Sequence, residues 1–226
     1  AEYARQDILI GTDPDADRVG LITRVPEDQR DAYDGRSHVL LDADDAWTLL
    51  LWYRFFQEAA VNGGQLVDQD KKFIVLSHIT TDALVRLSRK YGVGVVKTWV
   101  GFSMIANAIQ KVWSDQDLDD PQYRDLIYTT VDMQGRNINA GALEQSNGFS
   151  ILGGPPATRS GLGEGGHTRD KDGTFAAILL AEVAAYAKSQ DRTVMDLLDE
   201  YIYLDPDIGY FLTYCEPSPK WGEYKG

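Results

Sequence analysis

"KFIVLSHITTDALVRLSRKYGVGVVKTWVGFSMIANAIQKVWSD", residues 72–115, contains the pattern that decides the fold. Its first eight residues form a β-branched run typical of a strand, and residues 81–92 follow with helical spacing. Thr81 or Asp82 suits the start of that helix, and Gly92 suits its end. The same order then repeats, with a strand over 93–100 and a helix over 101–115. Strands and helices alternating at this spacing predict an α/β fold, a mixed sheet layered with helices and joined by crossovers.

On the N-terminal side, "DILIG" and "VGLITRV" are short buried strands with an acidic loop between them, and "PEDQRDAYDGRS" is a polar connector. Residues 42–61 carry apolar side chains at helical spacing. We expect Asp44 or Asp45 to cap this helix and "NGG" at 62–64 to end it. The predicted buried face consists of Trp47, Leu50, Leu51, Arg54, Phe55 and Ala59.

On the C-terminal side, residues 139–154 indicate two short strands around a turn. A long Gly-rich loop follows over 155–173, and "GTFAAILLAEVAAYAKSQ" is a strong helix. A further helix is predicted over 193–204. The final segment, 215–226, is punctuated by Pro and Gly and is typical of the start of a linker.

The composition restricts the class of protein. The 226 residues carry a formal net charge of −13, which argues against non-specific nucleic-acid binding because that needs a basic face. No apolar run is long enough for a membrane span. Cys215 is the only cysteine, so no internal disulfide can form, and we expect a cytoplasmic location. The first residues lack a signal peptide and enter a strand pattern at once, which indicates a piece of a longer protein.

Three aspartates at alternate positions, Asp13, Asp15 and Asp17, follow the first strand. Their charges repel unless something neutralises them, and clustered carboxylates suit Mg²⁺. An EF-hand would need Gly and Glu at the sixth and twelfth positions of the loop, where Arg18 and Arg24 stand. The loop therefore indicates a different cation site, with a solvated acidic turn as the alternative.

Three further segments carry polar side chains suited to binding. "GLGEGG" at 161–166 fits a dinucleotide pattern but neither follows a strand tightly nor opens a helix, so it is interpreted as a loop. His167, Arg169 and Lys171 precede a helix and suit an anion, although the neighbouring aspartates could simply cap that helix. "EQSNG" at 144–148 offers groups that bind sugar hydroxyls but that also build ordinary turns.

These motifs together resemble one family, the α-D-phosphohexomutase superfamily of phosphoglucomutases and phosphomannomutases. "TDPDADR" at 12–18 is similar to its metal loop, and "LEQSNGF" at 143–149 to its sugar-recognition loop. "HTRDKDGTFAAILLAEVAAY" at 167–186 resembles a segment found in phosphoglucomutases, and "KTWVGFSMIA" at 97–106 a stretch before a family helix. The resemblance covers nearly the whole chain in the right order.

The resemblance implies four domains in the complete protein, of which this chain is a middle segment. Residues 1–24 would be the end of the second domain with the metal loop, and 25–37 a connector. Residues 38–214 would be the third, sugar-binding domain, and 215–226 the start of a linker to the fourth. The phosphoserine motif of the first domain and the phosphate-binding loop of the fourth have no counterpart here, so those two domains are expected partners and the isolated segment should be inactive.

The implied reaction moves phosphate between O1 and O6 of a hexose phosphate through a bisphosphate intermediate. Mg²⁺ would be held by Asp13, Asp15 and Asp17 together with the phosphoserine of the missing first domain. Arg18 would add a fixed positive charge beside the cation.

The implied binding residues lie on the other motifs. Glu144 and Ser146 would grip sugar hydroxyls, and Gly101 belongs to the same substrate site. Lys171 would transfer a proton or contact phosphate. His167 and Arg169 would support Lys171 and belong to the substrate-binding residues.

Four positions depart from the family pattern, namely Val100, Ser103, Leu143 and Gln145. They leave a hexose phosphate as the expected substrate, with phosphoglucomutase favoured and a pentose phosphate as an alternative. A second alternative is a non-catalytic module that binds metal or phosphosugar on the same fold.

Overall fold

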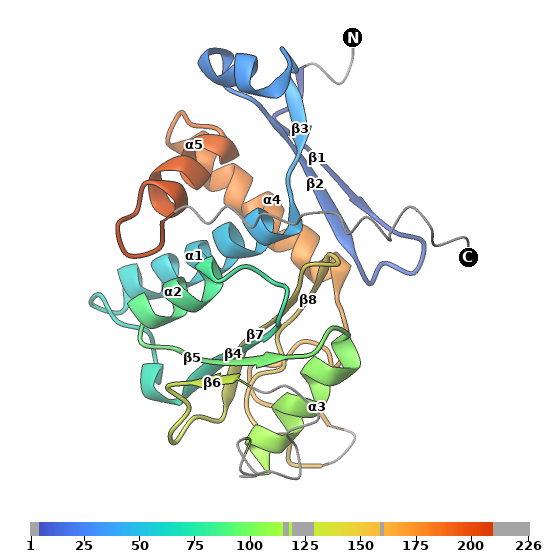
Figure 1. Ribbon diagram of the computed structural model, residues 1–226, viewed down its shortest axis with the longest axis vertical. Helices are drawn as coiled ribbons and strands as arrows, with labels where there is room; N and C mark the ends of the chain where they lie inside the picture. Colours follow the sequence, from blue (N-terminus) through green and yellow to red (C-terminus); the bar gives the residue numbers. More distant parts are fainter. Residues whose placement is uncertain (1–4, 115–117, 119–128, 159–160, 210–226) are drawn as a thin grey trace, which may run out of the picture.

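The computed structural model describes residues 5–114, 118, 129–158 and 161–209. The predicted linker over 215–226 and Cys215 lie outside these residues. The described chain contains two sheets, a small antiparallel one at one end of the molecule and a larger mixed one at the other (Figure 1).

The larger sheet has five strands in the order β6-β5-β4-β7-β8 within the described residues. The central strands β4 (Lys72–Ser77), β5 (Gly94–Thr98) and β7 (Ile138–Glu144) run parallel. The edge strands β6 (Thr129–Val131) and β8 (Gly148–Ser150) pair antiparallel to them. The predicted α/β class with a mixed sheet is therefore confirmed, as is the hairpin formed by β7 and β8.

Helices cover both faces of this sheet because its strands are apolar on both sides. Ile74 and Leu76 of β4 belong to the core under α1 (Ala43–Val61) and α2 (Ala83–Lys90). Phe73 and Val75 point the other way, toward α3 (Phe102–Trp113). Side chains alternate between the two faces of a strand, so one β-branched run supplies both cores.

Helix α1 is buried on more than the expected stripe, since every residue from 46 to 53 is buried. The expected caps are wrong: Asp42 is the N-cap residue, and its side chain accepts no capping hydrogen bond. Asp44 instead accepts a hydrogen bond from the Thr81 backbone N–H at 3.1 Å, at the start of the α2 segment. The helix ends as predicted at Asn62, where the following glycines have positive φ.

The small sheet contains β1 (Ile8–Thr12), β2 (Val19–Arg24) and β3 (His38–Leu40) in that order. The predicted connector over 25–37 contains a 3-10 helix, Glu27–Tyr33. Val19 and Leu21 of β2 are buried in the same core as α1. Helix α4 (Gly173–Ser189) contacts both β2 and β8, so it links the two sheets.

The C-terminal helical segment begins at a capping box, in which Thr193 and Asp196 each accept the other's backbone N–H. It consists of α5 (Val194–Leu198) and a π-helical turn, Asp199–Tyr203, where one continuous helix was predicted. A 3-10 turn, Gln69–Lys71, precedes β4. In the described part of the chain, no helix is both long enough and apolar enough to span a bilayer.

Candidate functional site

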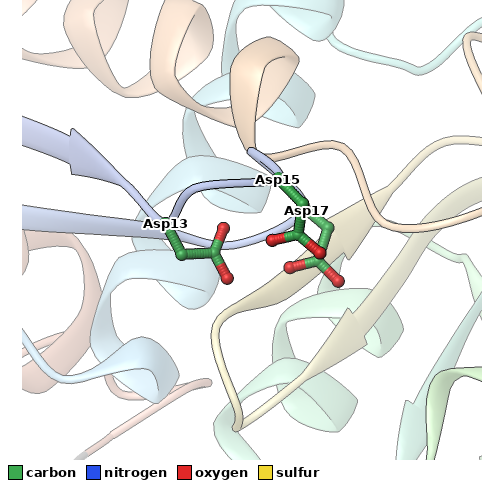
Figure 2. A group of neighbouring side chains, drawn as sticks. All are labelled: Asp13, Asp15 and Asp17. Carbon is green, nitrogen blue, oxygen red and sulfur yellow. The ribbon is translucent and has the colours of Figure 1, made fainter.

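The aspartate loop joins β1 to β2 as a tight turn. Ala16 has a φ of 57° and donates its N–H to the Asp13 carbonyl at 3.0 Å. This turn brings the three carboxylates to one side, and one oxygen from each of Asp13, Asp15 and Asp17 lies within 4.8 Å of the others. Figure 2 shows the three side chains gathered beyond the ends of the two strands. The i, i+2, i+4 spacing therefore produces the predicted cluster.

Arg18 neutralises part of this negative charge. Its Nε donates to Asp13 Oδ2 at 2.7 Å, and its backbone N–H donates to Asp13 Oδ1 at 3.1 Å. Partial burial raises the pKa of Asp13, but the hydrogen bonds from Arg18 and its charge outweigh that effect and bring the pKa down to about 2. Asp13 is thus held as a carboxylate through the physiological pH range.

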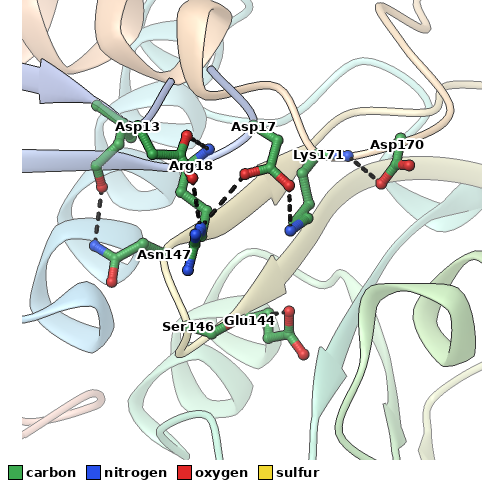
Figure 3. Close-up of polar contacts among 9 residues, drawn as sticks. Asp13, Asp17, Arg18, Glu144, Ser146, Asn147, Asp170 and Lys171 are labelled. Atoms are coloured by element: carbon green, nitrogen blue, oxygen red, sulfur yellow. Dashed lines mark hydrogen bonds and ion pairs between the residues drawn. The ribbon is translucent and has the colours of Figure 1, made fainter. Parts of the chain in front are cut away.

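Lys171 supplies a second positive charge from a distant part of the sequence. Its Nζ forms an ion pair with Asp17 Oδ2 (Figure 3). The other oxygen, Asp17 Oδ1, is buried and lies 3.4 Å from Arg18 Nε. Within the residues that the structure describes, Asp17 Oδ1 accepts no hydrogen bond. This oxygen is a buried acceptor that a cation could use.

The predicted sugar loop is the turn between β7 and β8. Glu144 is only 4% exposed, and both of its carboxylate oxygens are engaged. Oε1 accepts the Gly101 backbone N–H at 2.8 Å, and Oε2 accepts the Ser146 hydroxyl at 2.8 Å. The structure therefore brings together three residues that the sequence analysis grouped, and Glu144 holds the other two in place.

Backbone contacts join the aspartate loop to this turn. Arg18 and Gly148 form an antiparallel β-bridge, and the Asn147 amide donates to the Val19 carbonyl at 2.9 Å. An open hollow of about 340 Å³ lies between the two loops. It is lined by Gly11, Asp13, Arg18, Val19, Gly20, Ser146 and Asn147.

The residues at the start of α4 form backbone hydrogen bonds with both loops. The Gly173 N–H donates to the Ala16 carbonyl at 3.0 Å, and the Asp172 N–H donates to the Phe149 carbonyl at 2.7 Å. The stem of Lys171 passes over Gly148, where a Cβ atom would lie only 2.9 Å from Lys171 Cδ. The absence of a side chain at position 148 therefore lets Lys171 reach Asp17.

His167 and Arg169 make their contacts elsewhere. His167 Nδ1 pairs with the Asp172 carboxylate, and its ring stacks on Phe175 with centroids 4.1 Å apart. Asp172 caps α4 by accepting the Phe175 N–H at 2.8 Å, as the alternative interpretation of this segment had it. Arg169 donates to the carbonyls of Thr158 and Gly161 and lines a separate cavity beside α3.

Several positioning residues were not predicted. Trp47 Nε1 donates to the Glu144 carbonyl at 3.0 Å, and Thr80 Oγ1 accepts the Gln145 N–H at 3.2 Å. Asn147 and Gly173 act in the same way, as described above. The Asn-Gly and Asp-Gly pairs are turn signals in the sequence, but nothing local identifies which strand or loop each turn will meet.

No protein-family model matches the chain, and no curated protein matches it significantly. Among solved structures it is similar to the crystal structure of a protein named "putative phosphomannomutase" from Thermus thermophilus. The sequence identity is 22% and the TM-score is 0.49, over 85% of this chain. The match covers 30% of that protein, so this chain spans less than a third of its length. A likeness this distant carries no argument about function.

Proposed function

We propose that this chain is the central part of a phosphosugar mutase of the phosphohexomutase type, with phosphoglucomutase activity favoured. The observation that carries the proposal is that two of the sequence motifs line one hollow and that a third, through Lys171, contacts the aspartate loop beside it. The Asp13–Arg18 loop and the Glu144–Gly148 turn face each other across it. Lys171 reaches from the α4 segment to Asp17. A coincidental set of acidic and turn motifs has no reason to assemble in this way.

The aspartate cluster fits a divalent cation. Its donors are hard carboxylate oxygens, which Mg²⁺ prefers, and Asp17 Oδ1 is buried without a hydrogen bond in the described chain. The cluster remains negative, since three carboxylates meet two basic side chains, Arg18 and Lys171. When bound, Mg²⁺ would offset charge on a transferring phosphoryl group. A phosphoserine on the first domain of the complete protein would complete its ligands.

The chain's own residues would bind and orient the phosphosugar. Arg18 is fixed by two hydrogen bonds to Asp13, so it offers a positive charge that needs no reorganisation. Ser146 lines the hollow, and Glu144, only 4% exposed, accepts hydrogen bonds from its hydroxyl and from the Gly101 N–H. Glu144 would orient the sugar hydroxyls through the groups that it holds. Lys171 would contact phosphate or move a proton.

His167 and Arg169 would act indirectly under this proposal. His167 braces Asp172, the residue that caps α4 and precedes the Gly173 contact to the aspartate loop. Arg169 holds the carbonyl groups of the Gly-rich loop. Both would therefore support the position of Lys171, two residues beyond Arg169, without reaching the sugar themselves.

The test is a mutase assay on the full-length protein that contains this chain. Glucose 1-phosphate, mannose 1-phosphate and ribose 1-phosphate should be compared with Mg²⁺ present, and glucose 1-phosphate should turn over fastest. Asp15→Asn should lower kcat by roughly 100-fold or more, because a charged ligand of the cation is lost. Asp34→Asn, an equal charge change on the exposed turn after the 3-10 helix, should leave kcat unchanged.

Failure to convert any of the three sugar phosphates would refute the mutase proposal. Saturable binding of glucose 1-phosphate without turnover would identify the chain as a non-catalytic phosphosugar-binding module. A preference for ribose 1-phosphate would instead assign the protein to phosphopentomutases.

A further inference from the structure

Lys171 pairs with one of the three carboxylates that the cation would also need. Its ammonium pairs with Asp17 Oδ2, while Arg18 pairs with Asp13 and also lies 3.4 Å from Asp17 Oδ1. The two basic residues are attached differently. Arg18 contacts Asp13 through both its side chain and its backbone N–H. For Lys171, the ion pair with Asp17 is made by the flexible end of the side chain.

The path of the Lys171 side chain would let its ammonium reach a second position, near the turn between β7 and β8. Its stem lies against Gly148, since a Cβ atom at position 148 would be 2.9 Å from Lys171 Cδ and 3.2 Å from Lys171 Cγ. The same Cβ position is 3.4 Å from Glu144 Oε2. The stem and the Glu144 carboxylate therefore flank one glycine, and rotation about the terminal bonds would carry Nζ from the aspartate loop toward the sugar-binding turn.

We propose that Lys171 is a tethered cation that competes with the metal ion for Asp17, so that metal binding releases its ammonium toward Glu144 and Ser146. This inference rests on the proposed metal site. It adds an order of events: the cation binds first, and the lysine then becomes available to the phosphosugar. Lys171 is in this respect a positioning residue that couples the two halves of the hollow.

The physical basis is the repulsion between an ammonium and a divalent ion sharing one carboxylate. At a separation of roughly 5 Å in a water-like dielectric, this repulsion lowers the affinity for the divalent ion by roughly ten-fold. The effect is local, because exposed charges more than about 10 Å away are screened at ordinary ionic strength. Removing a distant lysine should therefore have little influence.

The experiment titrates the full-length protein that contains this chain with Mn²⁺ at fixed ionic strength and follows the electron paramagnetic resonance signal of the free ion. Mn²⁺ prefers the same octahedral oxygen ligands as Mg²⁺. Lys171→Met should bind Mn²⁺ roughly ten-fold more tightly than the wild type. Lys171→Arg, which keeps the charge, should remain within about two-fold of the wild type. Lys188→Met is the matched control, because Lys188 pairs with a different aspartate, Asp7, at 2.6 Å. Asp7 precedes β1, whereas the aspartate loop follows it.

A second measurement follows the ammonium itself. Brief acetylation with mass spectrometry should show Lys171 reacting several-fold faster when Mg²⁺ is saturating, while Lys188 reacts at an unchanged rate. A lysine that only supports the loop would show neither change, and its replacement by Met would weaken Mn²⁺ binding.

The outcomes separate this inference from the proposed metal site. If Lys171→Met binds Mn²⁺ no more tightly than the wild type, while Asp15→Asn abolishes binding, the competition is refuted and the metal site stands. If Mg²⁺ leaves the acetylation rate of Lys171 unchanged, the release is refuted. If no form of the full-length protein binds Mn²⁺ at millimolar concentration, both the site and the inference fail.

Discussion

Replacing Gly173 by alanine should loosen the aspartate loop, because the first residue of α4 lies directly against its backbone. A Cβ atom at position 173 would lie 2.6 Å from the Arg18 carbonyl oxygen and 2.8 Å from the Ala16 carbonyl oxygen. Ordinary contacts begin at 3.4 Å. Each carbonyl must therefore move away by roughly 0.6–0.8 Å, and backbone atoms cannot do so by changing a rotamer.

The expected loss follows from three contributions. Overpacking of this kind costs roughly 1–3 kcal/mol. The hydrogen bond from the Gly173 N–H to the Ala16 carbonyl, 3.0 Å long, would be stretched or broken, at a cost of about 1 kcal/mol. Alanine is a better helix former than glycine, which offsets roughly 0.5–1 kcal/mol. We expect the free energy of unfolding to fall by about 2 kcal/mol.

The assay is urea unfolding at pH 7 followed by far-ultraviolet circular dichroism, with hydrogen exchange as a local probe. The amides of Asp13 and Ala16, which bond within the loop, should exchange faster in the variant. Gly11→Ala is the matched control: a Cβ atom there would have no neighbour within 4 Å, so stability should change by less than about 0.5 kcal/mol. The reasoning is wrong if Gly173→Ala is as stable as Gly11→Ala, or if loop exchange is unaltered.

Three other residues, the partly buried Asp45, the capping Thr193 and the buried Trp47, allow further tests of stability. Burial raises the pKa of Asp45 to about 6, so the folded protein binds a proton at this carboxyl more tightly than the unfolded chain does. The free energy of unfolding should therefore fall as the pH rises from about 4 to 6. Asp45→Asn should therefore stabilise the protein by about 2 kcal/mol at pH 7 and by nothing near pH 4, and an equal gain at both pH values would contradict this. Thr193→Ala removes the capping box with Asp196 and should cost about 1 kcal/mol in urea unfolding, whereas Thr193→Ser should cost little; equal losses would argue against the cap. Trp47→Phe leaves space in a fully buried site and removes the donor to the Glu144 carbonyl, so it should cost about 2 kcal/mol, and a thermally unchanged variant would refute that role.

The order of strands and helices was predictable because it depends on local spacing. The apolar runs and the helical spacing between them in 72–100 indicate two strands joined by a helix, and the structure has β4, α2 and β5 there. The start of α1 was not predictable to the residue. Asp44 has the chemistry of a cap, but the backbone N–H of Thr81 uses its carboxylate, and that contact is not local in sequence.

The sequence by itself determined the α/β class and the clustering of three carboxylates, since spacing of two residues in a tight turn suffices for the cluster. Only the tertiary structure decided what meets that cluster. Lys171 arrives because α4 docks its first residues between Ala16 and Phe149, and because Gly148 has no side chain to block it. The same structure assigned His167 to Asp172 instead of to the hollow. The physical reason is that these choices depend on backbone hydrogen bonds and close approaches between segments far apart in the chain, which leave no periodic signal in the residues that make them.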